Sequence, residues 1–402
     1  MNEARDSNVE KRPSNGALRV AHVGRFKHES ASGVDRTITG LVTHLDGYGI
    51  ASEVWDVSPG NAAVTERRVG TVRVFDLPGF GTSRSAVNGL PRSTRTFIRR
   101  RRHRVDLIHL HSVFIPDNVW VATNAERPYV LTPHGGYNDN VIRGHNRIAK
   151  ALWLRIHERR HVRGASLVHA VSPQERQLLR NTFGEVTLQF IPNAVDLPAS
   201  PVRPDVRRRT APKRIVFLGR LAIDHKGLDL LLEGYARHIE QSSDQQTELV
   251  IAGPDFRDGL RRLRTIAASL GLRSRIHFPG PRYGPDQESL FESAYVFVHT
   301  SRWEGMPLAV LEAMASGCPV LVTAATNLAQ YVDDFGAGVV VEGSAEGIAD
   351  GLTHVLGAPV EQYDAMCSAA RNLVAQRFTW PRVATEMAAA YRGVLSPTRH
   401  DS

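Results

Sequence analysis

Residues 296–322, VFVHTSRWEGMPLAVLEAMASGCPVLV, decide the fold class. An apolar run at 296–300 leads into a helical run at 308–316, and a turn with glycine and proline separates that run from a second apolar run at 320–322. A glutamate, a glycine and a proline interrupt the apolar stretch 306–329, so it is not expected to form one membrane-spanning helix. A buried strand, a helix and another buried strand in this order indicate parallel strands joined by a crossover helix.

The same alternation continues along the rest of the chain. Helical spacing recurs between apolar runs, for example at 228–240. Further strands are expected at 18–23, 107–111, 129–132, 167–171, 189–191, 215–218, 249–252, 276–278 and 338–341. This order predicts an α/β fold with two tandem Rossmann-like, doubly wound domains that face a central cleft.

A break near the middle of the chain divides the two predicted domains. Residues 194–214 contain four prolines and six basic residues and show no apolar periodicity. The expected organisation is a disordered leader at 1–16, a first domain at 17–200, a linker at 201–213, a second domain at 214–379, and a helix with a tail at 380–402. Because this last helix has one apolar face, it can pack back on the first domain.

Composition excludes several classes of protein. The chain has 402 residues, of which 42% are hydrophobic and 23% charged, so global disorder is excluded. Two cysteines exclude a disulfide scaffold and a multi-cysteine zinc site, and they fit a reducing compartment. The first sixteen residues are polar and lack the apolar core of a signal peptide, so we expect a cytoplasmic protein. The net charge of +9 leaves anionic partners open, but no nucleic-acid motif occurs and nucleic acid is not expected.

Two glutamates flank the start of the helical run at 308–316. Glu304 precedes the helix, Pro307 suits its first position, and Glu312 lies inside it. The unpaired backbone N–H groups near Leu308 and Ala309 would form an anion site, strengthened by the helix dipole. One carboxylate could then accept hydroxyls of a sugar and the other hydroxyls of a ribose.

The stretch that includes Glu304, Gly305, Met306, Pro307, Leu308 and Glu312, and ends in Ala-Ser-Gly-Cys-Pro-Val, resembles a known motif. It is similar to the glutamate–seven residues–glutamate motif of retaining glycosyltransferases with two Rossmann-like domains, the large family 4 group. The resemblance covers roughly residues 18–395 and is closest in the C-terminal half. It implies the GT-B architecture, with these six residues binding the donor and Glu304 near the chemistry. The spacing alone would equally fit a helix with solvated carboxylates.

A second signal is Gly219-Arg220 followed by Lys226-Gly227. The strand at 215–218 delivers Gly219, where the backbone needs room. Two cations six residues apart at a cleft mouth suit a diphosphate. The resemblance implies that Arg220 and Lys226 hold the donor diphosphate and stabilise the leaving group. The alternative is a solvated basic turn.

Histidines and a glycine at strand ends complete the expected site. His134 lies between a strand and two glycines, and the resemblance implies that it lies beside the donor sugar and the reacting centre. Gly33 follows the first strand, where the family has a glycine-rich loop near the donor phosphate and acceptor. His109 and His111 share one face of a strand and could be metal ligands, but a structural role is favoured because no acidic or thiol partner has supporting spacing.

We expect no cofactor and no required metal. The chain contains no Asp-x-Asp pair, on which glycosyltransferases of the other large architecture hold a divalent ion. Neutralisation of the diphosphate by Arg220, Lys226 and the helix dipole would replace that ion.

The segment Arg92–Arg104 contains seven arginines and no acidic residue, and Arg155–Arg163 carries a further basic excess. Many members of the family work at a cytoplasmic membrane face on lipid-linked acceptors, so these segments could contact an anionic membrane surface. A solvated helix face is the alternative. The expected partners are thus a nucleoside diphosphate sugar, a sugar or lipid-linked sugar acceptor, and this membrane surface.

The function expected from this reading is retaining transfer of a sugar from a nucleoside diphosphate to an acceptor hydroxyl, in polysaccharide or glycolipid assembly. Two alternatives share the architecture. A nucleotide-sugar epimerase or hydrolase would need no sugar acceptor, and a non-catalytic protein would bind the nucleotide sugar without turnover. The presence of all the donor-site residues disfavours the non-catalytic alternative.

Overall fold

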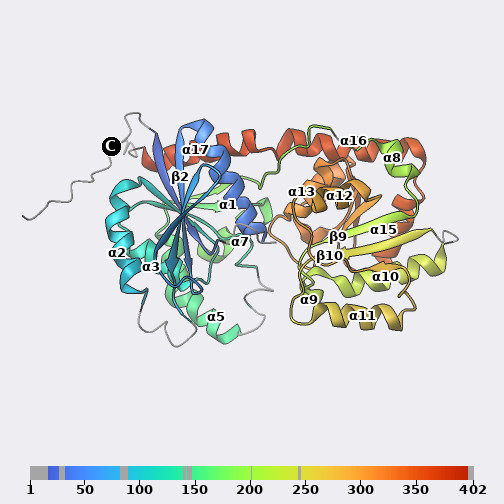
Figure 1. The fold of residues 1–402 in the computed structure, drawn as a ribbon, viewed down its shortest axis with the longest axis horizontal. Helices are drawn as coiled ribbons and strands as arrows, with labels where there is room; N and C mark the ends of the chain where they lie inside the picture. Colours follow the sequence, from blue (N-terminus) through green and yellow to red (C-terminus); the bar gives the residue numbers. More distant parts are fainter. Residues whose placement is uncertain are drawn as a thin grey trace, which may run out of the picture.

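The computed structural model describes residues 17–396, except 27–31, 82–88, 139–141, 143–146, 201 and 243–245. Two sheets with helices around them lie side by side, one formed by the N-terminal half of the chain and one by the C-terminal half (Figure 1). This arrangement confirms the predicted class of two doubly wound α/β domains. The expected leader at 1–16 lies outside the described residues.

The first sheet has the strand order β3-β4-β2-β1-β5-β6-β7-β8. All neighbours pair in parallel except β3 and β4. The strands are β1 (Leu18–Gly24), β2 (Ile50–Ser58), β3 (Thr65–Val69), β4 (Val72–Pro78), β5 (Leu107–His111), β6 (Tyr129–Thr132), β7 (Leu167–Ala170) and β8 (Leu188–Phe190). The chain adds β2 on one side of β1 and later adds β5 on its other side, so the order of strand addition reverses between β1 and β5. Such a switch point forms a crevice at the carboxyl ends of the strands.

The second sheet has the order β11-β10-β9-β12-β13-β14, with all neighbours parallel. Its strands are β9 (Lys213–Leu218), β10 (Thr247–Ala252), β11 (Ile276–His277), β12 (Val296–His299), β13 (Val320–Thr323) and β14 (Gly338–Val341). The switch point lies between β9 and β12, the strands that precede the two motifs identified in the sequence. Both motifs therefore lie at one edge of this sheet.

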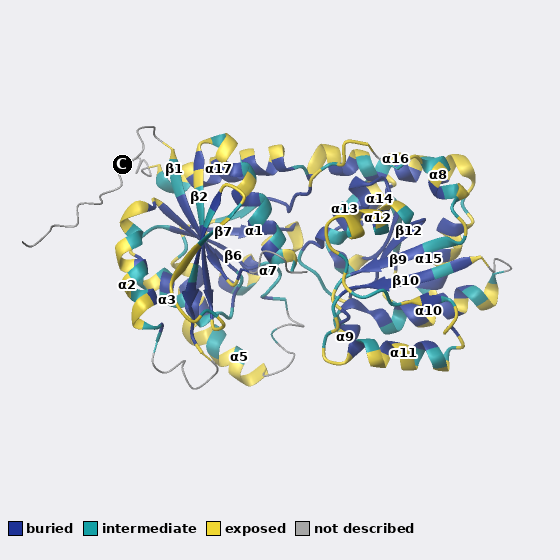
Figure 2. Cartoon of the chain, in the orientation of Figure 1, coloured by how far each residue is buried: buried dark blue, intermediate teal, exposed yellow. Residues whose placement is uncertain are grey.

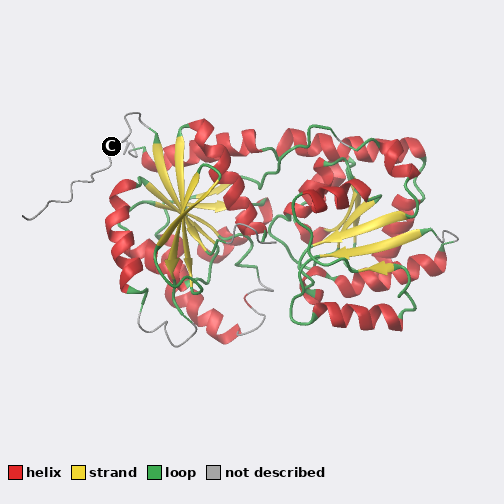
Figure 3. Ribbon diagram, viewed as in Figure 1, coloured by secondary structure: helices red, strands yellow, loops and turns green. Residues whose placement is uncertain are grey.

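Helices cover both faces of each sheet, as parallel strands with apolar residues on both faces require (Figures 2 and 3). Around the first sheet lie α1 (Gly33–His44), α2 (Arg92–Arg101), α3 (Pro116–Asn124), α5 (Arg147–Trp153), α6 (Arg159–Arg163) and α7 (Pro173–Phe183). With the second sheet are α8 (Pro204–Arg209), α9 (Ile223–Lys226), α10 (Leu228–Gln241), α11 (Gly259–Ser269), α12 (Pro285–Ser293), α13 (Leu308–Ala315), α14 (Ala329–Phe335), α15 (Ala345–Leu356) and α16 (Val360–Arg377). Separate apolar clusters fill the space on the two faces of each sheet.

The last helix, α17 (Trp380–Leu395), leaves the second domain and packs on the first (Figure 1). Trp380 packs against α1 at Gly40, where a Cβ would lie 1.8 Å from the indole ring. Farther along the helix, Tyr391 is fully buried and its hydroxyl lies 2.6 Å from Nδ1 of His109 in β5. The chain end thus links the two domains a second time.

The segment 201–213, expected to be a linker, contains a helix that packs on the second domain. Helix α8 lies within 201–213, and its Arg207 is buried. The guanidinium donates to the carbonyl oxygens of Phe291 at 2.7 Å, Ala294 at 2.5 Å and Ser316 at 2.8 Å. Because one buried arginine satisfies three carbonyl groups at the C-terminal ends of α12 and α13, α8 belongs to the second domain. Its basic, proline-rich composition concealed this helix in the sequence.

Other differences from the expected elements are smaller. Strands β2, β3 and β4 were not expected, and the strand expected at 276–278 is the two-residue β11. Pro307 is the residue before helix α13 and not its first residue. Within the described residues, no helix combines the length and apolar character that a membrane span requires.

Candidate functional site

A cavity of about 700 Å³ lies between the two domains. Its walls contain residues from the carboxyl ends of strands in both sheets and from the N-terminal turns of α1 and α13. Among the residues that the sequence predicted, the lining includes Gly33, His134, Gly219, Arg220, Lys226, Glu304, Gly305, Met306, Pro307 and Leu308. Glu312 does not line it. The fold therefore gathers segments that are up to about 270 residues apart into one cavity of ligand size.

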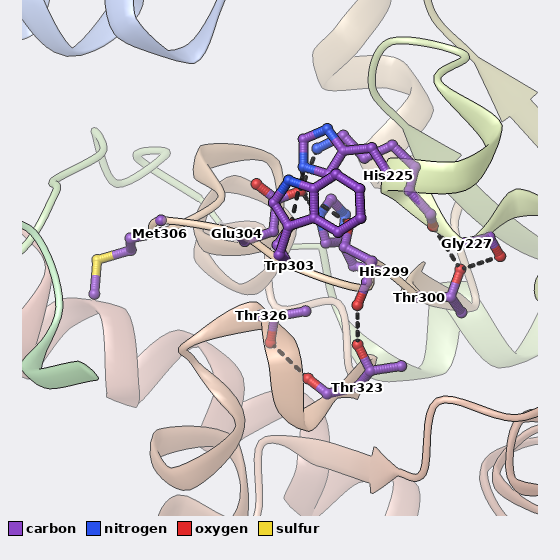
Figure 4. A network of polar contacts seen from close by, with 12 residues as sticks. His225, Gly227, His299, Thr300, Trp303, Glu304, Met306, Thr323 and Thr326 are labelled. Atoms are coloured by element: carbon purple, nitrogen blue, oxygen red, sulfur yellow. Dashed lines mark hydrogen bonds and ion pairs between the residues drawn. The ribbon is translucent and has the colours of Figure 1, made fainter. Parts of the chain in front are cut away.

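Glu304 is the centre of a polar network in the second domain (Figure 4). Lys226 Nζ forms an ion pair with Glu304 Oε1, and the side chains of both residues are only 11% exposed. The same oxygen accepts hydrogen bonds from His299 Nε2 at 3.1 Å and Ser301 Oγ at 2.9 Å. Burial alone would raise the pKa of Glu304, but Lys226, His299 and His225 together hold it well below its usual range. The carboxylate is therefore ionised and ready to accept further hydrogen bonds.

The turn that carries Lys226 is locked against the end of β12. Gly227 has a φ of +61°, and a Cβ there would lie 2.1 Å from the carbonyl oxygen of Thr300. The hydroxyl of Thr300 donates to the carbonyl oxygens of Lys226 and Gly227, both at 3.1 Å. Only glycine fits this approach, and it fixes the direction of the lysine that precedes it.

Arg220 provides a second cation at the cavity. It is exposed, its guanidinium lies 5.3 Å from the centre of the Phe256 ring, and it has no ion pair within the described part of the chain. The neighbouring Gly219 has little room, because a Cβ would meet the Phe217 ring at 3.1 Å. This agrees with the expected need for a small residue at the end of β9.

Both domains hold the loop before α13. Asn327 Nδ2 donates to the carbonyl oxygens of Glu304 at 2.7 Å and Gly305 at 2.9 Å. From the end of the first domain, Asn193 Nδ2 donates to the carbonyl oxygen of Met306 at 2.9 Å. The first N–H groups of a helix have no partner inside it, and those of Leu308 and Ala309 lie at the cavity wall. The predicted anion site is thus built on a fixed loop.

The domains approach each other closely at two glycines. A Cβ on Gly135 would lie 3.1 Å from the Cα of Gly305, and a Cβ on Gly305 would lie 3.3 Å from the carbonyl carbon of His134. His134 itself has a φ of +53°, an uncommon conformation for a residue with a side chain. Glu175 supports this turn by accepting a hydrogen bond from the N–H of Gly135 at 2.6 Å. The close contact places His134 opposite the glutamate loop.

Glu312 lies behind the cavity, in an ion pair between the domains. Its Oε1 contacts Arg36 of α1, and its Oε2 accepts a hydrogen bond from Gln287 at 2.9 Å. Burial lowers the pKa of Arg36 to about 10. In this arrangement Arg36 occupies the carboxylate that was expected to accept ribose hydroxyls, so that role stays a prediction. Gly33 is at the start of the same helix, and no atom of the described residues lies within 4 Å of the position that a Cβ would take there. Residues 29–31 of its loop lie outside the described residues.

Several cavity residues were not identified from the sequence. His225 and Trp303 stack with ring centres 4.6 Å apart, and His225 Nε2 donates to the carbonyl oxygen of Trp303 at 2.9 Å (Figure 4). Burial lowers the pKa of His225 to about 4. Arg36 was also missed. The position of His225 next to Lys226 and that of Trp303 next to Glu304 were the available signals.

The structure adds His22 to the pair His109 and His111, and the three buried rings have nitrogens within 4.8 Å of one another. Both nitrogens of His109 and both of His111 have hydrogen-bond partners. A metal ion that took one nitrogen from each ring would have to displace one hydrogen bond of His109 and one of His111. The arrangement therefore favours the structural role expected for this pair.

Comparison with known proteins identifies the family. Residues 31–198 match Glycosyltransferase Family 4, and residues 201–373 match Glycosyl transferases group 1. The chain belongs to these glycosyltransferases. The two matches together span both domains and the cleft between them, and they favour transfer over the alternatives of an epimerase or a binding protein.

Similar proteins span nearly the whole chain. A GDP-mannose:cellobiosyl-diphosphopolyprenol alpha-mannosyltransferase of Komagataeibacter xylinus is 26% identical over 403 residues, which is 96% of this glycosyltransferase and 95% of that protein. A protein of the same description from Xanthomonas campestris is 24% identical and covers 95% and 98%. The solved sucrose-phosphate synthase of Thermosynechococcus elongatus has a TM-score of 0.74 at 20% identity, and it covers 95% of this chain and 100% of its own. This last likeness shows the shared GT-B fold.

Proposed function

We propose that this glycosyltransferase moves a sugar, with retention of its anomeric configuration and without a metal ion, from a nucleoside diphosphate to an acceptor hydroxyl in the interdomain cavity. One observation carries the proposal. The cavity combines a buried, ionised Glu304, its partner Lys226, the exposed cation Arg220 and the N-terminus of helix α13. A carboxylate suits the hydroxyls of a sugar, and two cations beside a helix N-terminus suit a diphosphate, so the set matches a sugar joined to a diphosphate.

The donor diphosphate would lie between the two cations and the start of α13. Lys226, Arg220 and the backbone N–H groups at Leu308 and Ala309 would neutralise the charge that develops as the glycosidic bond breaks. On arrival of the donor, Lys226 would share its charge between Glu304 and the diphosphate. Because these groups supply the neutralisation, transfer should survive EDTA. Loss of activity with EDTA and recovery with Mg²⁺ or Mn²⁺ would contradict this part of the proposal.

Glu304 would bind hydroxyls of the donor sugar and would not attack it. Its carboxylate already accepts three hydrogen bonds or ion-pair contacts, which makes it a poor nucleophile. Attack of the acceptor on the same face, with the departing phosphate taking the proton, would then retain the configuration. The test is proton NMR of the first product formed, since an inverted anomeric centre would refute retention.

The first donor to test is GDP-mannose, because two full-length relatives are described as GDP-mannose-dependent mannosyltransferases that act on a diphosphopolyprenol-linked sugar. We propose an acceptor of the same kind, a sugar or a lipid-linked sugar. A thermal-shift screen over GDP-, UDP- and ADP-sugars would identify the donor. A ligand at 100 times its dissociation constant should stabilise the fold by about 2.7 kcal/mol.

A lipid-linked acceptor implies contact with a membrane, and we propose that the first domain contacts the cytoplasmic face. Ile148, Leu152 and Ile156 are 78%, 57% and 53% exposed. They are spaced by four residues, so they lie along one side of α5 and the π-helical turn Leu154–Glu158 that follows. Exposed arginines follow at 155, 159, 160 and 163. An apolar stripe beside basic residues is typical of a helix that lies in a membrane interface.

The arginine run of α2 contributes less to this surface than the sequence indicated. Arg101 pairs with Glu53 at 2.7 Å, and Arg102 pairs with Glu126 at 2.6 Å. The side chain of Arg101 is 12% exposed and lies against the Phe75 ring. Only part of the segment Arg92–Arg104 is therefore available to lipid headgroups.

A further inference from the structure

Three histidines form a hydrogen-bonded chain from the interior of the first sheet to the cavity. Nδ1 of His22 in β1 lies 3.1 Å from Nε2 of His111 in β5, and Nδ1 of His111 lies 3.1 Å from Nε2 of His134. His22 and His111 are 0% and 1% exposed, whereas His134 lines the cavity. We propose that His111 and His22 are positioning residues that fix the tautomer of His134, so that a neutral imidazole presents an N–H group to the nucleotide sugar. The inference rests on the proposed function only for the identity of the ligand.

A neighbouring chain of hydrogen bonds shows how tautomers are set in this sheet. His169 Nε2 lies 2.7 Å from the carbonyl oxygen of Ile191, which can only accept, so Nε2 carries the hydrogen. Its Nδ1 must then accept from the hydroxyl of Thr132 at 2.8 Å. Thr132 in turn accepts from His109 Nε2 at 2.6 Å, and His109 Nδ1 accepts from the hydroxyl of Tyr391 at 2.6 Å. Every hydrogen in this chain has one possible position.

This neighbouring chain of hydrogen bonds offers no donor or acceptor to His22. Both nitrogens of His109 are engaged, and His22 Nε2 is buried without a partner in the described part of the chain. Burial keeps these rings neutral, since it lowers the pKa of His22 to about 3 and that of His111 well below its usual value. A neutral ring has one donor and one acceptor nitrogen. The chain from His22 to His134 therefore has two possible directions.

The free nitrogen of His22 decides between the two directions. If hydrogens point away from the cavity, His22 Nε2 carries a buried N–H group with no acceptor. If they point toward the cavity, His22 Nε2 holds only an unused lone pair. Orphaned buried N–H groups are rarer in proteins than unused acceptors, so the second direction is favoured. His22 then donates to His111, and His111 donates to Nε2 of His134.

This direction determines what His134 offers a ligand. Its Nε2 accepts from His111, so Nδ1 carries the hydrogen and has no protein partner within the described residues. Burial lowers the pKa of His134 to about 3, which keeps the ring neutral at physiological pH. The N–H group can donate to a phosphate oxygen or a sugar hydroxyl. With no free lone pair, His134 cannot take the proton of the acceptor, which leaves that proton to the departing phosphate.

The tautomer can be measured on the unliganded parent protein. Long-range ¹H–¹⁵N NMR of histidine-labelled protein at pH 7.5 reports which ring nitrogen carries a hydrogen, and the His134→Gln variant assigns the signal. We expect a protonated Nδ1 and an unprotonated Nε2. The opposite tautomer, or a doubly protonated ring, would overturn the proposal whether or not the protein transfers a sugar.

Kinetics of a matched pair of variants test the positioning role. The side-chain amide of asparagine reaches the position of Nδ1 of histidine and that of glutamine the position of Nε2. His111→Asn should therefore keep the hydrogen bond to His134, and His111→Gln should lose it. We expect kcat to fall about tenfold in His111→Gln and less than threefold in His111→Asn, with KM for the donor within twofold of the parent. Equal losses in both variants, or no loss in either, would contradict the proposal.

His161→Gln is the control for these variants. His161 is buried in the same domain and stacks on Tyr129 with ring centres 5.6 Å apart. Neither of its ring nitrogens has a hydrogen-bond partner among the residues that the structure describes. Its replacement should leave kcat and KM near the parent values. If His161→Gln lowered kcat as much as His111→Gln, the effect would be a general consequence of disturbing the domain.

Discussion

The ion pair between Lys226 and Glu304 explains how a buried carboxylate remains charged beside an apolar sheet. Desolvation of a carboxylate costs several kcal/mol unless a cation and hydrogen bonds compensate. Lys226, His299 and Ser301 all contact the same oxygen, Oε1. Among the described residues the other oxygen, Oε2, has no hydrogen-bond partner, so under the proposed function it can accept from a ligand in the cavity.

Lys226→Met should weaken donor binding, since it keeps the apolar part of the side chain and removes one charge from the diphosphate site. A charge-assisted hydrogen bond contributes about 1.5–3 kcal/mol, so the affinity for a nucleoside diphosphate should fall by roughly ten- to a hundredfold. Calorimetric titration with the nucleoside diphosphate measures this affinity. Lys213→Met is the control, because Lys213 Nζ donates to the carbonyl oxygen of Leu356 at 2.7 Å and does not line the cavity. Unchanged affinity in Lys226→Met would remove this residue from the site.

Residues that belong to a local motif, or that the resemblance marks, such as His134 and Gly33, could be predicted for the site. The partners that folding alone brings to them could not. The stretch 304–308 and the turn at 219–226 each carry their chemistry locally, and the structure places both at the cavity. Arg36 lies far in sequence from Glu312, and 89 residues separate His22 from His111. No periodicity in the sequence relates such residues, because their contacts depend on strand order and domain closure.

At the scale of elements, α2 and α5 differ in what they expose: some arginines at the end of α2 are paired with acidic residues, whereas α5 exposes apolar side chains. Partners of the arginines in α2 lie on other elements, such as Glu53 in β2, which is 48 residues from Arg101. The charge run therefore looked more accessible in the sequence than it is. In contrast, the exposed apolar residues of α5 have no cover within the described part of the chain. Element boundaries also escaped prediction where a basic composition hid a helix, as in α8.

The double variant Leu152→Gln, Ile156→Gln should lose membrane binding. Both side chains are more than half exposed, so the fold should tolerate the change, while the apolar area that could enter a membrane interface is reduced. Flotation with vesicles containing anionic lipid should show about tenfold weaker binding. Val206→Gln is the control, because Val206 is 50% exposed on α8 of the other domain. Equal binding by the double variant and the parent would leave α5 as a solvated helix.

At the scale of the whole molecule, buried neutral histidines couple stability to pH. Burial lowers the pKa of His22 and His134 to about 3 and that of His161 and His169 to about 4. In the unfolded chain each would titrate near 6.5. Between pH 6.5 and 4 the unfolded chain therefore binds more protons than the folded chain, so the free energy of unfolding rises with pH.

We expect stability to fall as the pH decreases below 6.5. Each histidine that stays neutral removes about 1.4 kcal/mol per pH unit, and several act together. Urea unfolding at pH 7.5, 6.5 and 5.5 measures the change. His161→Phe should lower the slope of the free energy of unfolding against pH by the contribution of about one proton. This variant removes one of these groups, and the ring nitrogens of His161 have no hydrogen-bond partner among the described residues. A free energy of unfolding that stays constant or rises toward pH 5.5 would contradict the neutral state of these rings.

Under the proposed function, transfer in the cleft between the two domains depends on Glu304 of the second domain. The most direct test is to make two measurements on the Glu304→Gln variant. One measurement is the initial rate of transfer with the nucleotide sugar that stabilises the protein most, and the other is calorimetric binding of the bare nucleoside diphosphate. Loss of a charge-assisted acceptor should lower transfer by roughly one to two orders of magnitude. Binding of the diphosphate should stay equal or become tighter, because Lys226 is released from its partner. Unchanged transfer, or a loss of diphosphate affinity as large as the loss of transfer, would contradict a sugar held by Glu304 in this cleft.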